Sequence, residues 1–204
     1  MTFLFLALSY VVGATPTSFW VGRAFYGVDL REKGSGNLGA TNVYRVLGWK
    51  AAVPVVLIDM AKGWVPVGLF AAAIDASLLW TLAFGTAAIV GHMFSFWVGF
   101  RGGKGVATSS GVFLALAPWA VLGSFVVWMA LTFGSGYVSL GSIGAAVVLP
   151  VLVLLTPHRG GAALTVFAFA LGAFVVWAHR ANIGRLARGE ENRFGRRSGG
   201  AGAS

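Results

Sequence analysis

Six long apolar blocks, separated by short polar junctions, dominate this sequence and leave few folds open to it. They cover about 2–22, 51–74, 77–99, 106–133, 138–156 and 161–178. A helix needs about 20 apolar residues to cross the hydrocarbon layer of a bilayer. Only 10% of the residues are charged, whereas soluble domains average about 25%. The pattern predicts an all-α polytopic integral membrane protein.

Basic residues gather in three stretches between these blocks. Of 15 Lys and Arg, five lie within 23–50, two within 101–104 and six within 180–197. Because basic loops stay on the cytoplasmic side, we expect the N-terminus outside and the C-terminus in the cytoplasm. The net charge of +9 favours anionic lipid headgroups or small anionic substrates as partners, and no nucleic acid. The chain has no cysteine, which excludes disulfides and thiolate metal sites.

Six crossings would put both chain ends on the same side, which contradicts this orientation. Block 106–133 offers the simplest repair, because Pro118 lies near its middle and proline breaks a helix. Two short arms that turn near Pro118 would give seven helices. Five spans, with one other block re-entrant or interfacial, are the alternative. We expect one membrane domain over 1–204, with a disordered tail at about 196–204.

Two polar segments contain residue types that suit phosphate. The stretch GSGNLGATNVYRVLG, residues 34–48, offers glycine amides, hydroxyls and Arg45, whose planar guanidinium matches a phosphate group. The stretch RGGKG, residues 101–105, combines glycine amides with Lys104 at the start of a predicted helix. Alone, GGKG is a weak signal without the full Walker spacing. A flexible connector and a charged turn are the simpler interpretations of these two segments.

Other polar residues allow more than one interpretation. The basic segment after 178 either contributes His179 and Asn182 to a site or forms an amphipathic helix on anionic headgroups. Asp59 and Lys62 lie in a predicted span at i, i+3, so an ion pair is expected. His92 is more often structural in such a place. Ser139 and Ser142 either bind substrate hydroxyls or cap a helix. The sequence shows no metal-ligand cluster, spaced carboxylate pair or nucleophile elbow.

Taken together, the polar segments closely resemble the bacterial acyl-phosphate:glycerol-3-phosphate acyltransferases, the PlsY family. That family has the motifs GSGNxGATNxxR, GHxxPxxxxFKGGKGVAT and HRxNIxRLxxGxE in this order, which match 34–45, 91–108 and 179–191 here. The resemblance extends through DxxKG and VSLGS and covers nearly the whole chain. Two positions depart from the pattern: Ser95 replaces the proline of the second motif, and Arg101 replaces its first lysine.

The resemblance implies an enzyme that transfers an acyl group from acyl phosphate to the 1-hydroxyl of sn-glycerol 3-phosphate. The products would be lysophosphatidic acid and phosphate, in phospholipid biosynthesis. It implies a multi-pass protein of the bacterial cytoplasmic (inner) membrane, with its active site facing the cytoplasm and with membrane lipids around it. No cofactor, metal ion or obligatory protein partner is expected.

The same resemblance implies the site residues. The catalytic set is Lys104, His179, Asn182 and Ser142. The substrate-binding set is Ser35, Gly36, Asn37, Gly39, Thr41, Asn42, Arg45, Gly102, Gly103, Gly105 and Glu191. Within it, the glycines after Arg101 are expected to cradle the acyl-phosphate headgroup with their N–H groups. For the proton of the attacking hydroxyl, two acceptors stay open: His179 and a phosphate oxygen of the donor, of which we favour the second.

Two other protein classes compete with this interpretation. An organophosphate transporter would hold its substrate near the midplane between repeated halves, whereas the polar segments here gather at one face and no internal repeat is evident. A CDP-alcohol phosphotransferase would need an acid-rich metal motif, and the whole chain has only six acidic residues. The enzyme is therefore the favoured interpretation.

Overall fold

The computed structural model describes residues 1–194, and within that part the chain is helical without any strand. The predicted tail at 196–204 lies outside the described residues. The α-helices are α1 Thr2–Ala14, α2 Thr17–Tyr26, α3 Ala40–Leu47, α4 Trp49–Val65, α5 Ala71–Ala73, α6 Leu78–Met93, α7 Val106–Leu116, α8 Pro118–Ser135, α9 Val138–Leu155, α10 Gly161–Ala178 and α11 Arg180–Ala187. A π-helical turn, η1 Pro66–Phe70, joins α4 to α5, and a 3₁₀ turn, η2 Phe96–Val98, follows α6.

Five helical segments in the described part are long and apolar enough to cross a bilayer. They are Trp49–Ala73, Leu78–Val98, Pro118–Ser135, Val138–Leu155 and Gly161–Ala178. The bent pair α1 and α2 gives a sixth if it counts as one span. Helix α7 is apolar but has 11 residues, about 16 Å of helix, which is too short to span. The count of seven helices and the orientation of the termini stay predictions.

Block 106–133 is divided at the predicted place. Helix α7 ends at Leu116, and Pro118 is the first residue of α8. Between them, Ala117 has a non-helical backbone (φ −148°, ψ 67°), since proline disfavours a helical residue before it. The arms have 11 and 18 residues, so the expectation of two short arms is wrong for the second. Proline alone does not decide such a break, because Pro54 and Pro150 lie inside α4 and α9.

The first apolar block also breaks, which its hydropathy did not predict. Helices α1 and α2 are bent by 43° around Thr15 and Pro16. Such a break frees carbonyl groups, and away from water each of them needs a donor. The Ser95 hydroxyl donates to the carbonyl of Ala14, and Lys62 Nζ donates to the carbonyl of Thr15 at 2.9 Å. Side chains from α4 and from the segment after α6 therefore stabilise the bend.

Glycines bring α4 and α7 into close contact. A Cβ at Gly63 would collide with the carbonyl of Thr108, and a Cβ at Gly111 would collide with the carbonyl of Met60. Small residues allow helix backbones in membranes to approach each other in this way. The short helix α7 is thereby fixed against the N-terminal part of the molecule.

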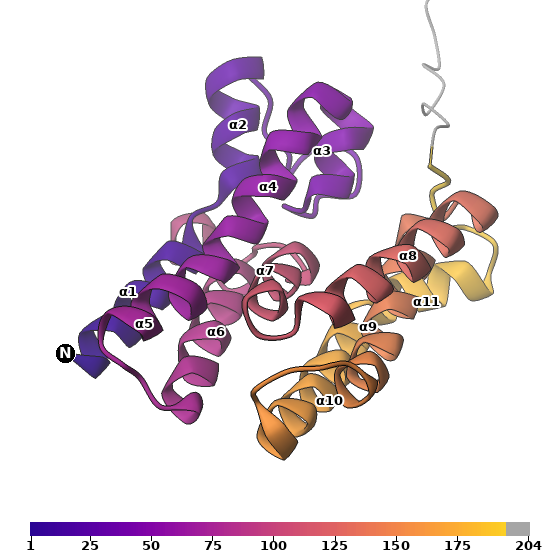
Figure 1. The fold of residues 1–204 in the computed structure, drawn as a ribbon. Coiled ribbons are helices and arrows are strands. Elements are labelled where there is room, and N and C mark those ends of the chain that lie inside the picture. The colour runs from indigo at the N-terminus through magenta and orange to yellow at the C-terminus, as the bar shows by residue number, and fades with distance from the viewer. Residues whose placement is uncertain (195–204) are drawn as a thin grey trace, which may run out of the picture.

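Helix α7 stands between two groups of helices. Figure 1 shows α1 to α6 on one side of α7 and α8 to α11 on the other. In the second group, α8 packs on α9 and α9 packs on α10. Val112 and Phe113 of α7 are fully buried in the larger hydrophobic core. Because α7 begins just after Lys104, the fold places the 101–105 segment where the two groups meet.

Candidate active site

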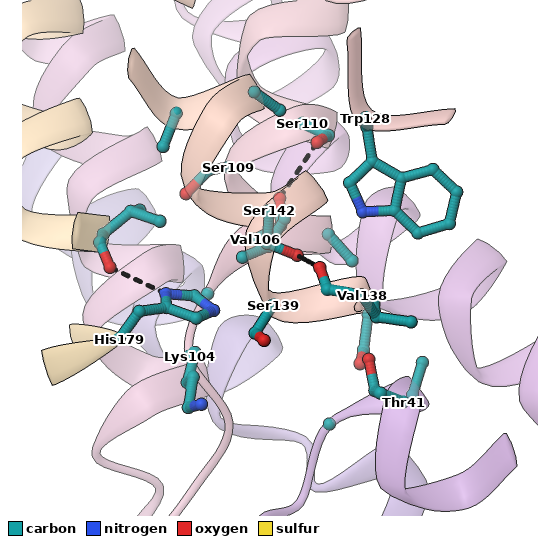
Figure 2. Close-up of a pocket in the computed structure, with 18 of the residues that line it drawn as sticks. Thr41, Lys104, Val106, Ser109, Ser110, Trp128, Val138, Ser139, Ser142 and His179 are labelled. Carbon is teal, nitrogen blue, oxygen red and sulfur yellow. Dashed lines mark hydrogen bonds between the residues drawn. The ribbon is translucent and has the colours of Figure 1, made fainter. Parts of the chain in front are cut away.

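A cavity of about 700 Å³ lies between the two groups of helices. Figure 2 shows Lys104, Ser139 and His179 at one end of its wall and Trp128 at the other. Its wall combines many polar and many apolar side chains. The polar ones include Ser35, Asn37, Thr41, Arg45, Lys104, Ser139, Ser142, His179, Asn182, Arg185 and Glu191, and the apolar ones include Leu57, Leu114, Leu122, Phe125, Trp128, Leu149 and Val175.

Hydrogen bonds tie Lys104 to the C-terminal segment. The Lys104 ammonium donates to Asn182 Oδ1, and Asn182 Nδ2 donates to Glu191 Oε1 at 2.8 Å. Arg185 Nε donates to Glu191 Oε2 at 2.7 Å, and the Ser139 hydroxyl donates to Oε1 at 3.2 Å. Glu191 is only 9% exposed, and these three donors stabilise its charge. Its carboxylate therefore holds Asn182 and Arg185 in place.

The site carries an excess of positive charge. Burial, followed by the charge of Arg185, lowers the pKa of Lys104 to about 8, although Glu191 acts in the opposite direction and Arg45 adds to the lowering. Burial also lowers the pKa of the Arg45 guanidinium, against the effect of Glu191. Three cations thus influence one another around a single buried carboxylate. An anion that entered the cavity would relieve this repulsion and stabilise the charged form of each.

The imidazole of His179 is oriented by a backbone carbonyl rather than by a carboxylate. His179 Nδ1 lies 2.8 Å from the carbonyl oxygen of Val175. A carbonyl only accepts, so Nδ1 carries the proton and Nε2 of the neutral ring carries the lone pair. Burial is the main cause that lowers the pKa of His179 to about 4, and Lys104 contributes. Near neutral pH, His179 is therefore an uncharged acceptor and a weak base.

The 34–39 loop is shaped from within by Asn42. Its Oδ1 accepts a hydrogen bond from the Ser35 N–H at 2.8 Å, and its Nδ2 donates to the carbonyls of Leu30 and Lys33 at 3.1 and 3.0 Å. Gly34 has φ +63°, where other residues are strained, and a Cβ there would collide with Asn42 Oδ1. The amide of Asn42 is therefore used to hold the loop, although the family motif suggested a substrate contact.

The N–H groups of Gly102 and Gly103 have hydrogen-bond partners within the protein. The N–H of Gly102 donates to the carbonyl of Met93 at 2.9 Å, and the N–H of Gly103 donates to the carbonyl of His92 at 3.2 Å. A Cβ at Gly103 would also collide with the His92 ring. Neither glycine lines the cavity. The expectation that their N–H groups face a phosphate is a prediction that this geometry does not favour. They attach the loop to the end of α6 instead.

The starts of two helices lie at the wall of the cavity. Gly105 (φ +79°) lines it and precedes α7, followed by Val106 and Ala107. Across the cavity, Gly39 precedes α3, followed by Ala40 and Thr41. The first N–H groups of a helix have no partner within that helix, and its dipole is positive there. Two helix N-termini therefore border the same cavity as the cations.

Part of the apolar wall is open to the surroundings of the protein. Leu57 of α4 and Leu122 and Phe125 of α8 line the cavity while they remain 60%, 50% and 51% exposed. On apolar helices of a membrane protein, such surface faces lipid. The apolar part of the cavity wall is therefore continuous with exposed side chains of α4 and α8.

A buried charged group lies under the loops. Lys62 Nζ and Asp59 Oδ1 are 2.8 Å apart, which confirms the ion pair expected from their spacing, and His92 Nδ1 is 3.9 Å from the same oxygen. All three side chains are buried. His92 contacts the 102–103 loop and Lys62 binds the bend of the first block, so the group joins both to α4. No group of three or more His, Cys, Asp or Glu within residues 1–194 is arranged to hold a metal ion.

The chain is similar in sequence and fold to known proteins of one family. Residues 3–189 match the family model described as glycerol-3-phosphate acyltransferase. This chain belongs to the glycerol-3-phosphate acyltransferase family. The curated glycerol-3-phosphate acyltransferase of Fusobacterium nucleatum is 42% identical over 194 residues, which are 94% of this chain and 97% of the relative. That of Geobacter sulfurreducens is 44% identical over 188 residues, 92% and 95% of the two chains.

Two solved structures are also similar to this glycerol-3-phosphate acyltransferase family member. Both are crystal structures of PlsY, an integral membrane glycerol 3-phosphate acyltransferase. The glycerol 3-phosphate form has a TM-score of 0.86 at 38% identity and covers 95% of this chain and 96% of its own. The lysophosphatidic acid form has a TM-score of 0.84 at 37% identity, with 95% of each chain covered. The predicted family and the all-α membrane fold are confirmed, and the transporter and phosphotransferase alternatives fall away.

Most residues expected from the motifs of the acyltransferase family meet at the cavity, but a few lie elsewhere. Gly36, Gly102 and Gly103 do not line it. Arg185 also lines the cavity, although the motifs gave this residue of the basic C-terminal segment no catalytic or substrate-binding role. Its signal was present, since Arg185 follows Asn182 at i, i+3 and so lies on the same face of α11. The Ser142 hydroxyl donates to the carbonyl of Val138 at 2.9 Å (Figure 2) and can still accept a hydrogen bond there.

Proposed function

We propose that this acyltransferase moves an acyl group from acyl phosphate to the 1-hydroxyl of sn-glycerol 3-phosphate. The products are lysophosphatidic acid and inorganic phosphate, and the reaction takes place in one membrane domain at the cytoplasmic side of a bacterial inner membrane. The observation that carries the proposal is the combined character of the cavity: a cluster of cations is continuous with an apolar wall that is partly exposed to lipid. Both parts are needed by a pair of anionic substrates of which one has a long chain.

Glycerol 3-phosphate binds among the cations. Arg45 presents a planar guanidinium that pairs with two phosphate oxygens, Lys104 adds an ammonium, and the Ser35 hydroxyl at the exposed loop adds a donor. The first residues of α3, Ala40 and Thr41, line the same cavity, where the positive end of the helix dipole favours an anion. The relatives with known structure include a glycerol 3-phosphate form, which supports the assignment. Ser142, His179 and Asn182 orient the glycerol hydroxyls.

The acyl phosphate donor places its phosphate near the start of α7. There Gly105 and the first amides of the helix replace the expected contacts from Gly102 and Gly103, and Lys104 lies beside them. Phosphate is the leaving group, so its negative charge grows in the transition state. Fixed donors and a cation at that position stabilise this charge more than that of the ground state. This is the main contribution of the site to the rate.

The transfer step needs no covalent enzyme intermediate. The 1-hydroxyl oxygen bonds to the acyl carbon, the bond from that carbon to the phosphate oxygen breaks, and the hydroxyl proton passes to a phosphate oxygen. The low pKa of His179 favours this route, because so weak a base accepts little of the proton. His179 then uses its Nε2 lone pair to accept a hydrogen bond that orients a glycerol hydroxyl.

Acyl transfer by the purified protein in lipid vesicles tests the proposal. Palmitoyl phosphate, palmitoyl-coenzyme A and the acyl carrier protein thioester are offered as donors with radiolabelled glycerol 3-phosphate. We expect lysophosphatidic acid from palmitoyl phosphate alone, and none from a Lys104→Ala variant that unfolds at the same temperature. Product from a thioester at an equal rate would overturn the assigned donor. Full activity of Lys104→Ala would overturn the assigned site.

A further inference from the structure

The chain that follows α11 returns across the polar end of the cavity. At Gly189 (φ +70°) it reverses, with the N–H of Glu190 donating to the carbonyl of Arg185 at 2.8 Å. Glu191 then enters the hydrogen-bond network described above. Residues 190–194 lie past the part of the chain that matches the family model, which ends at 189. We name residues 189–194 the strap.

The end of the strap is fixed to the turn between α8 and α9. The N–H of Phe194 donates to the carbonyl of Gly136 at 2.6 Å. Arg193 Nε donates to the Tyr137 hydroxyl at 3.2 Å, with its guanidinium 5.4 Å from the centre of that ring. The Phe194 ring also meets Phe133 of α8 edge-on, with centroids 5.7 Å apart. The strap therefore belongs to the C-terminal group of helices.

The same ring reaches the other group of helices. Phe194 stacks on Tyr44 of α3 with ring centroids 4.7 Å apart and planes 14° from parallel. Helix α3 packs mainly on α4 and α2, which belong to the N-terminal group. The stack thus connects the two sides of the cavity at the residue next to Arg45.

Attraction and repulsion act together across this connection. Glu191 attracts Arg45 more strongly than Arg185 repels it, whereas Lys104 is repelled by both arginines. Arg45 comes from α3, whereas Arg185 and Glu191 belong to the C-terminal side. These opposing effects do not by themselves fix the spacing of the two sides. A contact that depends on no charge can hold them at a fixed spacing.

We propose that Phe194 and Tyr44 are positioning residues, whose stacked rings hold Arg45 opposite Arg185 and Lys104 so that the phosphate site is formed before glycerol 3-phosphate arrives. The proposal rests on the assignment of Arg45 to that substrate made above. It is distinct from catalysis, because neither ring needs to touch the reacting atoms. The stack affects substrate capture through the position of α3.

Steady-state kinetics of Phe194→Ala test this role. We expect the KM for glycerol 3-phosphate to rise about three- to tenfold, the range given by the loss of one aromatic pair, with kcat within about twofold. Phe194→Tyr should restore the KM, because a tyrosine ring also stacks. The matched control is Phe3→Ala, which removes an aromatic contact with Trp80 at 5.5 Å on the far helices and should leave the KM unchanged. An unchanged KM in Phe194→Ala overturns the proposal.

A cross-link between positions 44 and 194 tests whether this contact stays closed during turnover or has to open. The chain has no cysteine, so Y44C/F194C can be joined without side reactions elsewhere by a short cross-linker that forms a disulfide with each thiol and is released by reduction. We expect the cross-linked protein to keep its turnover and to recover the KM that the unlinked double variant loses. Loss of turnover on cross-linking, regained on reduction, would show that the contact must open and would overturn the proposal. Arg45→Ala in the same assay separates the assignment of Arg45 to the phosphate from the role of the stack. An unchanged KM in Arg45→Ala refutes the assignment of Arg45. A raised KM in Arg45→Ala together with an unchanged KM in Phe194→Ala refutes only the role of the stack.

Discussion

The Lys104 ammonium donates a hydrogen bond to the Asn182 amide oxygen, although 78 positions separate the two residues. The contact joins the start of α7 to α11, and so joins the middle of the molecule to its C-terminal segment. Through Asn182 Nδ2 it continues to Glu191 at 2.8 Å. An amide is suited to this place because it accepts from a cation on one side and donates to a carboxylate on the other.

Asn182→Asp should therefore weaken the binding of glycerol 3-phosphate, although the two side chains have nearly the same size. The new carboxylate would pair with Lys104, compete with substrate phosphate and lose the donor that faces Glu191. We expect the KM for glycerol 3-phosphate to rise about 10- to 100-fold, the range of one hydrogen bond to a charged group. A titration with glycerol 3-phosphate at saturating acyl donor measures it. A KM equal to that of the parent protein would show that Asn182 has no such role.

The lowered pKa of Lys104 predicts the pH dependence of substrate capture. Lysine is charged below its pKa and neutral above it, so kcat/KM should fall by tenfold per pH unit above about 8. On the acid side, kcat/KM should rise toward about pH 6, where the phosphate monoester becomes a dianion. The decrease of kcat at alkaline pH should occur at a higher pH than that of kcat/KM, because bound anions favour the charged lysine.

Lys104→Arg provides the control for this assignment. Arginine stays charged throughout the accessible range, so the limb above pH 8 should vanish whatever happens to the maximal rate. Persistence of the same limb in Lys104→Arg would assign it to another group.

The same substitution at two adjacent glutamates should change the free energy of unfolding by different amounts. Glu191 is buried and accepts from Asn182, Arg185 and Ser139, so Glu191→Gln should lower the free energy of unfolding by about 1–3 kcal/mol. Glu190 pairs with Arg188 at the surface, with side chains 57% and 60% exposed, so Glu190→Gln should change it by less than about 1 kcal/mol. Thermal unfolding of the two variants in detergent compares them directly. Equal stability of both would contradict the role given to Glu191.

Ser95 allows a test of the position at which this chain departs from the family motif. Its hydroxyl donates to the carbonyl of Ala14 at the bend of the first block, and Ser95→Ala should lower the free energy of unfolding by about 1–2 kcal/mol. Ser95→Pro should cost less than Ser95→Ala. Its φ of −71° suits proline, and proline reduces the entropy of the unfolded chain. Unfolding in detergent measures both. A proline variant less stable than the alanine variant would show that the backbone at Ser95 does not tolerate proline.

Hydropathy was sufficient to locate the long helices, because each apolar block must satisfy its own backbone hydrogen bonds within a membrane. The block from 138 to 156 corresponds to α9, Val138–Leu155, and the block from 161 to 178 corresponds to α10. The bend near Pro16 was missed, since it depends on donors that are distant in sequence, Lys62 and Ser95. Pro16 alone therefore did not predict the bend, whose carbonyl groups are satisfied by residues that only the fold brings near.

The motifs predicted which residues lie at the cavity better than they predicted what each of these residues binds. Asn42 and Gly103 belong to the recognised motifs, yet their polar groups are used inside the protein. A motif shows which residue type a position needs but not why. An internal hydrogen bond can require that residue type as strictly as a contact with substrate does. Stacking between Tyr44 and Phe194 had no sequence signal, because two aromatic residues 150 positions apart can be paired only by the fold.

In the proposed function, the exposed apolar wall formed by α4 and α8 makes this protein a catalyst at a phase boundary. Glycerol 3-phosphate would reach the site from water, and the proposed acyl donor would come from the plane of the bilayer, past Leu57 and Leu122. The concentration that governs its rate is then the mole fraction of the donor in the bilayer. Diluting the donor with inert lipid should slow the enzyme even when the amount of donor per millilitre is unchanged.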